Sequence, residues 1–148
     1  MAAFVLDSSV ALAWYLPRQQ TARTDALMHR MADEGALTTA LWPIEVASVL
    51  LIYERRGQLT TADRMGAIAF YSSAPIELDD QTQTRAWGTA FDLAKAQKLT
   101  VYDAGYLELA LRCGLPLATL DQALCKAAAA LGVPVLGYGE DAEVPPSG

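Results

Sequence analysis

Four acidic residues stand out because each interrupts an apolar stretch of the sequence. They occur in FVLDSSVALAW, WPIEVASVL, TVYDAGYLELAL and LATLDQAL, and are Asp7, Glu45, Asp103 and Asp121. Carboxylates that converge in a partly desolvated cleft repel one another, so they either take up protons or hold a cation. Ligand sets made only of oxygen select hard ions such as Mg²⁺ or Mn²⁺, and such an ion activates water for phosphodiester cleavage.

The composition argues against other metal chemistry. The chain has one histidine, His29, and two cysteines, Cys113 and Cys125, without CxxC spacing. A zinc site of the His/Cys type needs three or four such ligands, so any bound metal is expected on oxygen atoms. Both cysteines lie in apolar stretches, which favours buried free thiols over a disulfide.

Short apolar runs alternate with helical periodicity along the whole chain. Strands are expected at 3–6, 36–39, 76–78, 117–120 and 133–136. Helices are expected at 8–16, 21–34, 43–56, 60–73, 80–97, 101–112 and 122–131. This alternation predicts an α/β fold, a three-layer α/β/α arrangement around a central parallel sheet of four or five short strands.

The predicted sheet gives the four acids a common location. Right-handed crossovers bring the carboxyl ends of parallel strands to one edge, where such sheets bind ligands. Asp7 and Asp121 directly follow the first and fourth strands, and Glu45 and Asp103 lie in the first turns of helices that follow strands or loops. We therefore expect all four carboxylates at the same edge.

Helix capping is the alternative explanation for each acid taken singly. Acids in a first turn are favoured by the helix dipole. Asp7 and Asp121 have the placement of N-cap residues, and Thr100 with Asp103 resembles a capping box. Four caps would be scattered around the domain, however, whereas these four are predicted to converge.

Taken together, the four motifs resemble those of PIN-domain ribonucleases, and most closely those of the VapC-type toxins of toxin–antitoxin pairs. The resemblance runs from Phe4 to about Leu136, with the motifs in the same order and on the same elements. It implies a Mg²⁺- or Mn²⁺-dependent endoribonuclease, with the four acids as metal ligands and catalytic residues.

Two hydroxyl residues match the same family pattern. Ser9 lies two residues after Asp7, and Thr119 lies two residues before Asp121. The resemblance implies that both orient water or the ligand carboxylates, although a helix start and a strand also explain them. Many members carry a further acid after the last one, whereas residues 122–124 are Gln-Ala-Leu here. This departure weakens the case for a second ion and for Asp121 as a ligand.

The resemblance also implies partners. They are an RNA substrate, a small antitoxin protein that blocks the site, and a second copy of the chain in a homodimer. Trp14, Trp42, Ile52 and Tyr53 are candidates for a partner groove, but core packing is the more ordinary role for each of them.

Three other functions remain open at this point. The first is a PIN-type nuclease in RNA processing outside a toxin pair. The second is an aspartyl phosphatase, which usually has another Asp two residues after its nucleophile, where this chain has Ser9. The third is a binding module without catalysis, in which the acids are only caps.

Length and charge define the remaining expectations. The 148 residues suit one domain, assigned to 1–137 as a PIN-like nuclease, followed by a flexible tail at 138–148. Hydrophobic residues make up 53% of the chain, yet no run is long enough for a membrane helix and no signal peptide is evident, so we expect a cytoplasmic protein. The net charge of −6 argues against a broad basic surface for nucleic acid.

Overall fold

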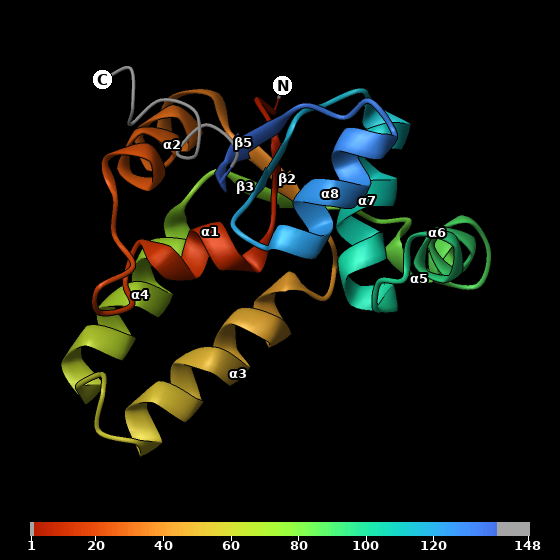
Figure 1. The fold of residues 1–148 in the computed structure, drawn as a ribbon. Helices are drawn as coiled ribbons and strands as arrows, with labels where there is room; N and C mark the ends of the chain where they lie inside the picture. Colours follow the sequence, from red (N-terminus) through yellow and green to blue (C-terminus); the bar gives the residue numbers. More distant parts are fainter. Residues whose placement is uncertain (1, 139–148) are drawn as a thin grey trace.

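A sheet of five parallel strands forms the centre of the computed structural model, which describes residues 2–138 (Figure 1). The strand order is β3-β2-β1-β4-β5. The strands are β1 (Val5–Leu6), β2 (Ala36–Thr38), β3 (Ile76–Leu78), β4 (Leu117–Thr119) and β5 (Val135–Gly137). The predicted α/β class and parallel sheet are confirmed, whereas residues 139–148 of the predicted tail lie outside the described residues.

The adjacent strands β1 and β4 are short, and all of their residues are buried. Val5 of β1 lies opposite Leu37 of β2 on one side and Leu117 of β4 on the other. Backbone bonds continue the pairing past the end of β1, because the Asp7 N–H donates to the Ala118 carbonyl at 3.1 Å. Asp7 is therefore held by the sheet ladder itself, one residue beyond the strand.

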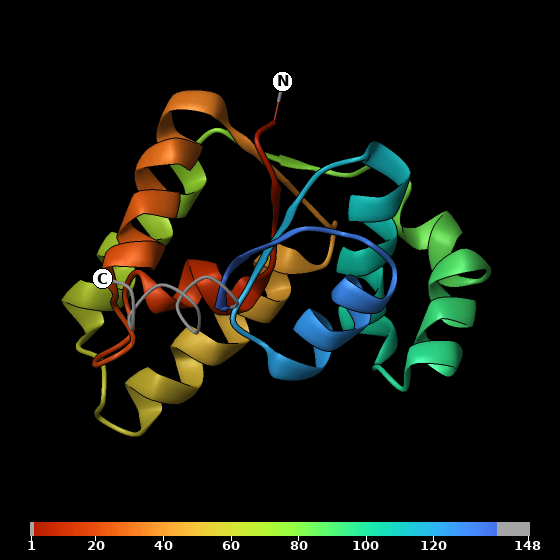
Figure 2. The ribbon, with the colours of Figure 1, turned by 45° about the horizontal axis from the view of Figure 1, so that its top comes forward.

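Eight helices of the described chain cover the two faces of this sheet (Figures 1 and 2). On one side lie α1 (Ser8–Ala13), α2 (Ala22–Glu34), α3 (Trp42–Arg55) and α4 (Thr61–Ser73). On the other lie α5 (Thr82–Ala86), α6 (Thr89–Gln97), α7 (Val101–Cys113) and α8 (Gln122–Ala130). This division follows from right-handed crossovers, since the chain moves outward from β1 to β3 in one direction and from β4 to β5 in the other.

One predicted helix is wrong. The expected single helix at 80–97 is two helices, because Gly88 has φ −130° and ψ −102° and interrupts the hydrogen-bond ladder between α5 and α6. Trp87, the last residue before the break, is 90% exposed. The apolar spacing continued across this point, so periodicity alone did not reveal the turn. The other helix and strand boundaries differ from the predicted ones by a few residues.

The core fills the space between sheet and helices and includes two of the candidate groove residues. Trp14 and Trp42 are buried, and core packing was the role favoured for both, whereas Ile52 is exposed.

Cys113 is also exposed, which corrects the expectation of a buried thiol, and both cysteines are free. Among residues 2–138, no helix has the length and apolar character needed to cross a membrane.

Candidate active site

The strand order reverses between β1 and β4, and the first and last of the four acids follow these two strands. The chain runs from β1 outward to β3 and then returns to place β4 on the free side of β1. Loops that leave two adjacent strands in opposite directions open a crevice between them, which is where open α/β sheets bind ligands. Asp7 and Asp121 lie at this position, and we call the carboxyl ends of β1, β2 and β4 the acid edge.

Asp7 is 97% buried, and hydroxyl groups fix its carboxylate. Its Oδ2 accepts hydrogen bonds from the Ser9 hydroxyl at 2.7 Å and the Thr119 hydroxyl at 2.6 Å. Asp7 occupies the N-cap position of α1 but makes no side-chain cap bond. Capping therefore does not account for Asp7, and both candidate hydroxyl residues contact it.

The same two hydroxyls also connect the loops that follow β1 and β4. Ser9 Oγ accepts from the Leu120 N–H at 2.9 Å, and Thr119 Oγ1 accepts from the Asp121 N–H at 3.1 Å. Each hydroxyl thus accepts from one backbone N–H and donates to Asp7. This arrangement fixes the direction of both O–H bonds, so Asp7 Oδ2 has a defined orientation.

Glu45 approaches the acid edge from α3 and is held by α7. Pro43 lies in the first turn of α3, as predicted, and Glu45 follows it in that turn. Glu45 Oε2 accepts a hydrogen bond from the hydroxyl of Tyr106 at 2.8 Å. Asp103 lies one turn before Tyr106, so α7 contributes an acid and a hydroxyl on neighbouring turns.

Asp121 makes the capping contact that the alternative explanation predicted. Its Oδ2 accepts from the Leu124 N–H at 2.8 Å and caps α8. Half of the proposed capping box at α7 is also present, with Thr100 Oγ1 accepting from the Asp103 N–H at 3.1 Å. A cap bond occupies one oxygen only, so it is compatible with a ligand role for Asp121.

Burial and mutual repulsion raise the pKa values of three acids. For Asp7 the cause is burial, with the charge of Asp121 adding to it and the Thr119 and Ser9 hydroxyls partly offsetting it. Burial and the charges of Asp7 and Asp103 raise the pKa of Glu45 to about 6. Burial and the charges of Asp7 and Asp121 raise the pKa of Asp103 to about 6. The four acids therefore belong to one electrostatic cluster.

The cluster is not a closed ligand set. Within residues 2–138, no three Asp, Glu, His or Cys side chains are close enough together to form a ready-made ion site. Asp7, Glu45 and Asp121 each have hydrogen-bond partners of their own. The donor chemistry nevertheless fits a hard divalent cation, because every candidate ligand atom is a carboxylate oxygen and a cation would offset the repulsion that raises the pKa values.

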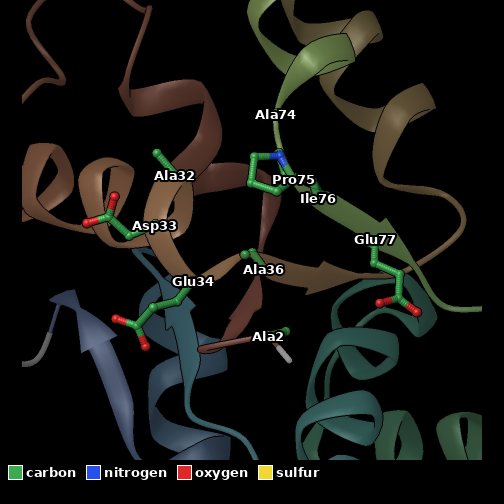
Figure 3. A pocket seen from close by; sticks show the side chains of 10 residues that line it. Ala2, Ala32, Asp33, Glu34, Ala36, Ala74, Pro75, Ile76 and Glu77 are labelled. Atoms are coloured by element: carbon green, nitrogen blue, oxygen red, sulfur yellow. The ribbon is translucent and has the colours of Figure 1, made fainter.

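A wide pocket of about 450 Å³ lies at the opposite edge of the sheet, where β2 and β3 begin (Figure 3). Its acids are Asp33, Glu34 and Glu77, which are all exposed and do not converge (Figure 3). None of the four motif acids lines this pocket.

Comparison with known proteins agrees with this architecture. Residues 4–130 match the PIN domain family. The chain belongs to the PIN domain family. Ribonuclease VapC3 of Pyrobaculum aerophilum is 29% identical to it over 130 residues, which cover 88% of this chain and 98% of that protein.

Two crystal structures share the fold of this PIN domain. PAE2754 from Pyrobaculum aerophilum superposes with a TM-score of 0.67 at 21% identity, covering 90% of this chain and 83% of that one. FitAcB from Neisseria gonorrhoeae gives a TM-score of 0.63 at 16% identity, with 92% and 98% covered. At these identities the likeness concerns the fold.

Sequence reasoning missed two residues beside the acid edge of this PIN domain. The sequence did not single out Tyr106, because a tyrosine at its position in α7 is equally typical of an aromatic residue packed in the core. Cys125 lies in α8, where burial and the charges of Asp121 and Asp7 raise its pKa to about 11. Its thiol is therefore neutral beside the acids.

Asp79 is an acid that none of the four motifs includes. It is buried at the end of β3, where Arg112 Nη2 and Nη1 donate to its carboxylate at 2.8 and 3.2 Å. Arg112 also donates to Glu108 at 2.9 Å. This ion cluster joins the end of β3 to α7, on which Asp103 and Tyr106 lie.

Proposed function

We propose that this PIN domain is a Mg²⁺- or Mn²⁺-dependent endoribonuclease that acts as the toxin of a toxin–antitoxin pair. The observation that carries the proposal is the buried Asp7 carboxylate, oriented by the Ser9 and Thr119 hydroxyls at the point where the strand order reverses. The similarity to a protein named Ribonuclease VapC3 supports the same chemistry.

In this proposal the acid edge holds the ion, with Asp7, Glu45, Asp103 and Asp121 as its ligands. The bound ion supplies Lewis-acid polarisation of a phosphoryl oxygen and a lower pKa for water. The chain's own residues orient the site. Ser9 and Thr119 hold Asp7, so the carboxylate does not need to reorganise when the ion and the RNA bind.

Neutral donors suit this role. The described partners of these acids are hydroxyl and backbone N–H groups, which orient a carboxylate without cancelling its charge. The ion pairs that arginines form within residues 2–138 involve other acids, at positions 34, 54, 79 and 108. The negative charge of the edge thus stays available for a cation.

Three partners complete the proposal. They are an RNA substrate, a small antitoxin protein that covers the acid edge, and a second copy of the chain. A single chain has a mass of 15.9 kDa, so light scattering of the purified protein is expected to give about twice that value.

An aspartyl phosphatase is less well supported. Such an enzyme needs a general acid close to its nucleophile. Two residues after Asp7 the chain has Ser9, whose hydroxyl donates to Asp7 itself.

The proposal is tested with the purified full-length chain and a labelled single-stranded RNA. Cleavage is expected with Mg²⁺ or Mn²⁺ and none with excess EDTA, because the acids cannot activate water without a cation. Induced expression in cells is expected to arrest growth. Metal-independent cleavage would contradict the nuclease mechanism, and metal-dependent cleavage without growth arrest would favour an RNA-processing enzyme.

A further inference from the structure

We infer that Tyr106 is a positioning residue that fixes the Glu45 carboxylate for cation binding at the acid edge. The inference rests on the proposed function and concerns a residue outside the four acidic positions and their two neighbouring hydroxyls. Tyr106 is completely buried in α7, and its hydroxyl donates to Glu45 Oε2 at 2.8 Å across 61 residues of sequence.

The location of the hydroxyl explains why a tyrosine is useful there. Glu45 has three rotatable side-chain bonds and begins in the first turn of α3, so its carboxylate has many possible positions. The Tyr106 hydroxyl selects one of them. It also interacts with the hydroxyl of Ser8, which donates to Asp7 Oδ1 at 3.3 Å. Tyr106 therefore lies between Glu45 and the start of α1, next to Asp7.

The chemistry of the phenol fits positioning without neutralisation. A lysine or arginine at this place would orient Glu45 but would also compensate its charge and compete with a cation. A phenylalanine would fill the same core volume but leave the carboxylate unrestrained. Only the hydroxyl leaves Glu45 both charged and oriented, with Oε2 used by the tyrosine and Oε1 directed elsewhere.

A second buried tyrosine provides a matched comparison within the same chain. Tyr71 in α4 is 92% buried, and its hydroxyl donates to the backbone carbonyl of Ala11 at 2.6 Å. Each tyrosine donates one hydrogen bond through its hydroxyl, buried at Tyr71 and part-buried at Tyr106, and within residues 2–138 the Tyr71 bond goes to a backbone carbonyl rather than to an acid. Removing either hydroxyl costs a hydrogen bond, and only removal at position 106 frees a carboxylate at the acid edge.

The test measures Mn²⁺ binding to the full EDTA-treated chain by isothermal titration calorimetry. Tyr106→Phe is expected to weaken Mn²⁺ binding by about tenfold, the usual scale for a residue that orients a ligand. Tyr71→Phe is expected to lower the melting temperature while leaving the Mn²⁺ dissociation constant within about twofold of wild type. The Mn²⁺ concentration for half-maximal RNA cleavage should rise for Tyr106→Phe, with kcat recovered at saturating Mn²⁺.

Glu45 variants show whether Tyr106 acts through this acid. In a Glu45→Gln background, Tyr106→Phe is expected to cause no further loss of affinity. Glu45→Asp keeps the charge but shortens the side chain by one methylene, which withdraws it from the hydroxyl. Glu45→Asp should therefore also weaken Mn²⁺ binding. If Tyr106→Phe does not fold, the Mn²⁺ affinity of Glu45→Asp tests the positioning role in its place.

Failure of the Tyr106 positioning role and failure of the proposed function give different results. If Glu45→Gln weakens Mn²⁺ binding while Tyr106→Phe and Glu45→Asp bind as tightly as wild type, the positioning role is wrong and the proposed function stands. Equal losses from Tyr106→Phe with and without Glu45 would also overturn the role. If wild type shows no Mn²⁺ binding, the proposed function fails and the inference fails with it.

Discussion

At the level of single residues, neutral hydroxyl groups orient the carboxylates of Asp7 and Glu45 in this PIN domain. Asp7 Oδ2 accepts from two hydroxyls, and Glu45 Oε2 accepts from one. Each donor leaves the other oxygen of its carboxylate in a defined direction. In the proposed function, this orientation is set before a cation or a substrate binds, as expected of groups that support a metal ligand.

A substitution of Thr119 tests whether its hydroxyl orients Asp7. Thr119→Val keeps the shape of the side chain but removes the bond to Asp7 and the acceptor for the Asp121 N–H, which should cost about 1–3 kcal/mol of unfolding free energy. RNA cleavage should fall by about tenfold or more, as expected when a metal ligand loses its supporting bond. Urea denaturation and cleavage rates provide the two measurements.

Thr38 is the matched control. It is fully buried, and its hydroxyl donates at 2.7 Å to the Leu6 carbonyl rather than to an acid. Thr38→Val should lose comparable stability and keep its cleavage rate. If Thr119→Val and Thr38→Val have equal activity, Thr119 does not orient Asp7 for catalysis.

The raised pKa values predict how stability depends on pH. Glu45 and Asp103 have pKa values of about 6 in the folded chain, above their ordinary values of 4.5 and 3.8. The folded state therefore binds more protons than the unfolded chain between about pH 4 and pH 6, so unfolding free energy rises as pH falls through this window. The melting temperature of the EDTA-treated protein should be higher at pH 5 than at pH 7.5.

Asp103→Asn should reduce this response, because it removes one titrating acid and part of the repulsion on Glu45. The pKa of Asp79 is shifted in the opposite direction. Burial alone would raise this pKa, but Arg112 holds it below the ordinary value of 3.8. The contribution of Asp79 to the unfolding free energy is therefore lost only below that pH, outside the range in which Glu45 and Asp103 titrate. A melting temperature that falls steadily from pH 7.5 to pH 5 would contradict the account.

At the level of elements, the acid edge depends on how α7 is held against the sheet. This helix carries Asp103 and Tyr106 near its start and Glu108 and Arg112 further along. Arg112 ties it to Asp79 at the end of β3. Asp79 and Glu108 are both buried, so their charges need compensation. Arg112 compensates both, and Arg85 lies 3.9 Å from Glu108 as a second, longer ion pair.

Arg112→Met should destabilise the fold by about 3 kcal/mol, because it leaves the buried Asp79 carboxylate without its cation and leaves Glu108 with Arg85 alone, at 3.9 Å. Guanidinium chloride unfolding measures the loss. Arg64→Met is the control, since Arg64 forms a single, more exposed pair with Glu54 and should change the unfolding midpoint little. Equal effects of the two variants would show that the cluster does not hold α7.

The same elements show what sequence reasoning could predict. The strand–helix order and the placement of Asp7 and Asp121 followed from apolar runs that end in an acid, which is a local signal. The break at Gly88 was missed because helical spacing continued across it. The Asp79–Arg112 contact and the Tyr106–Glu45 bond were missed because each joins elements distant in sequence, and neither residue type reveals its partner.

At the level of the whole molecule, the strand order brings motifs from four parts of the chain to one edge. Asp7 and Asp121 flank the reversal between β1 and β4, and the paths after β2 and before α7 add Glu45 and Asp103. The net charge of −6 is partly a property of this edge. In the proposed function, a cation bound at this edge would reduce the repulsion that RNA phosphates meet there.

The most direct test of this account compares RNA cleavage by Asp7→Asn and Asp33→Asn in the same Mn²⁺ buffer. Asp33 is exposed at the opposite edge of the sheet (Figure 3). Asp7→Asn should melt cooperatively and lose about a hundredfold or more of the cleavage rate, a barrier increase of about 3 kcal/mol. Asp33→Asn should cleave like wild type. Full cleavage by folded Asp7→Asn would contradict the central claim.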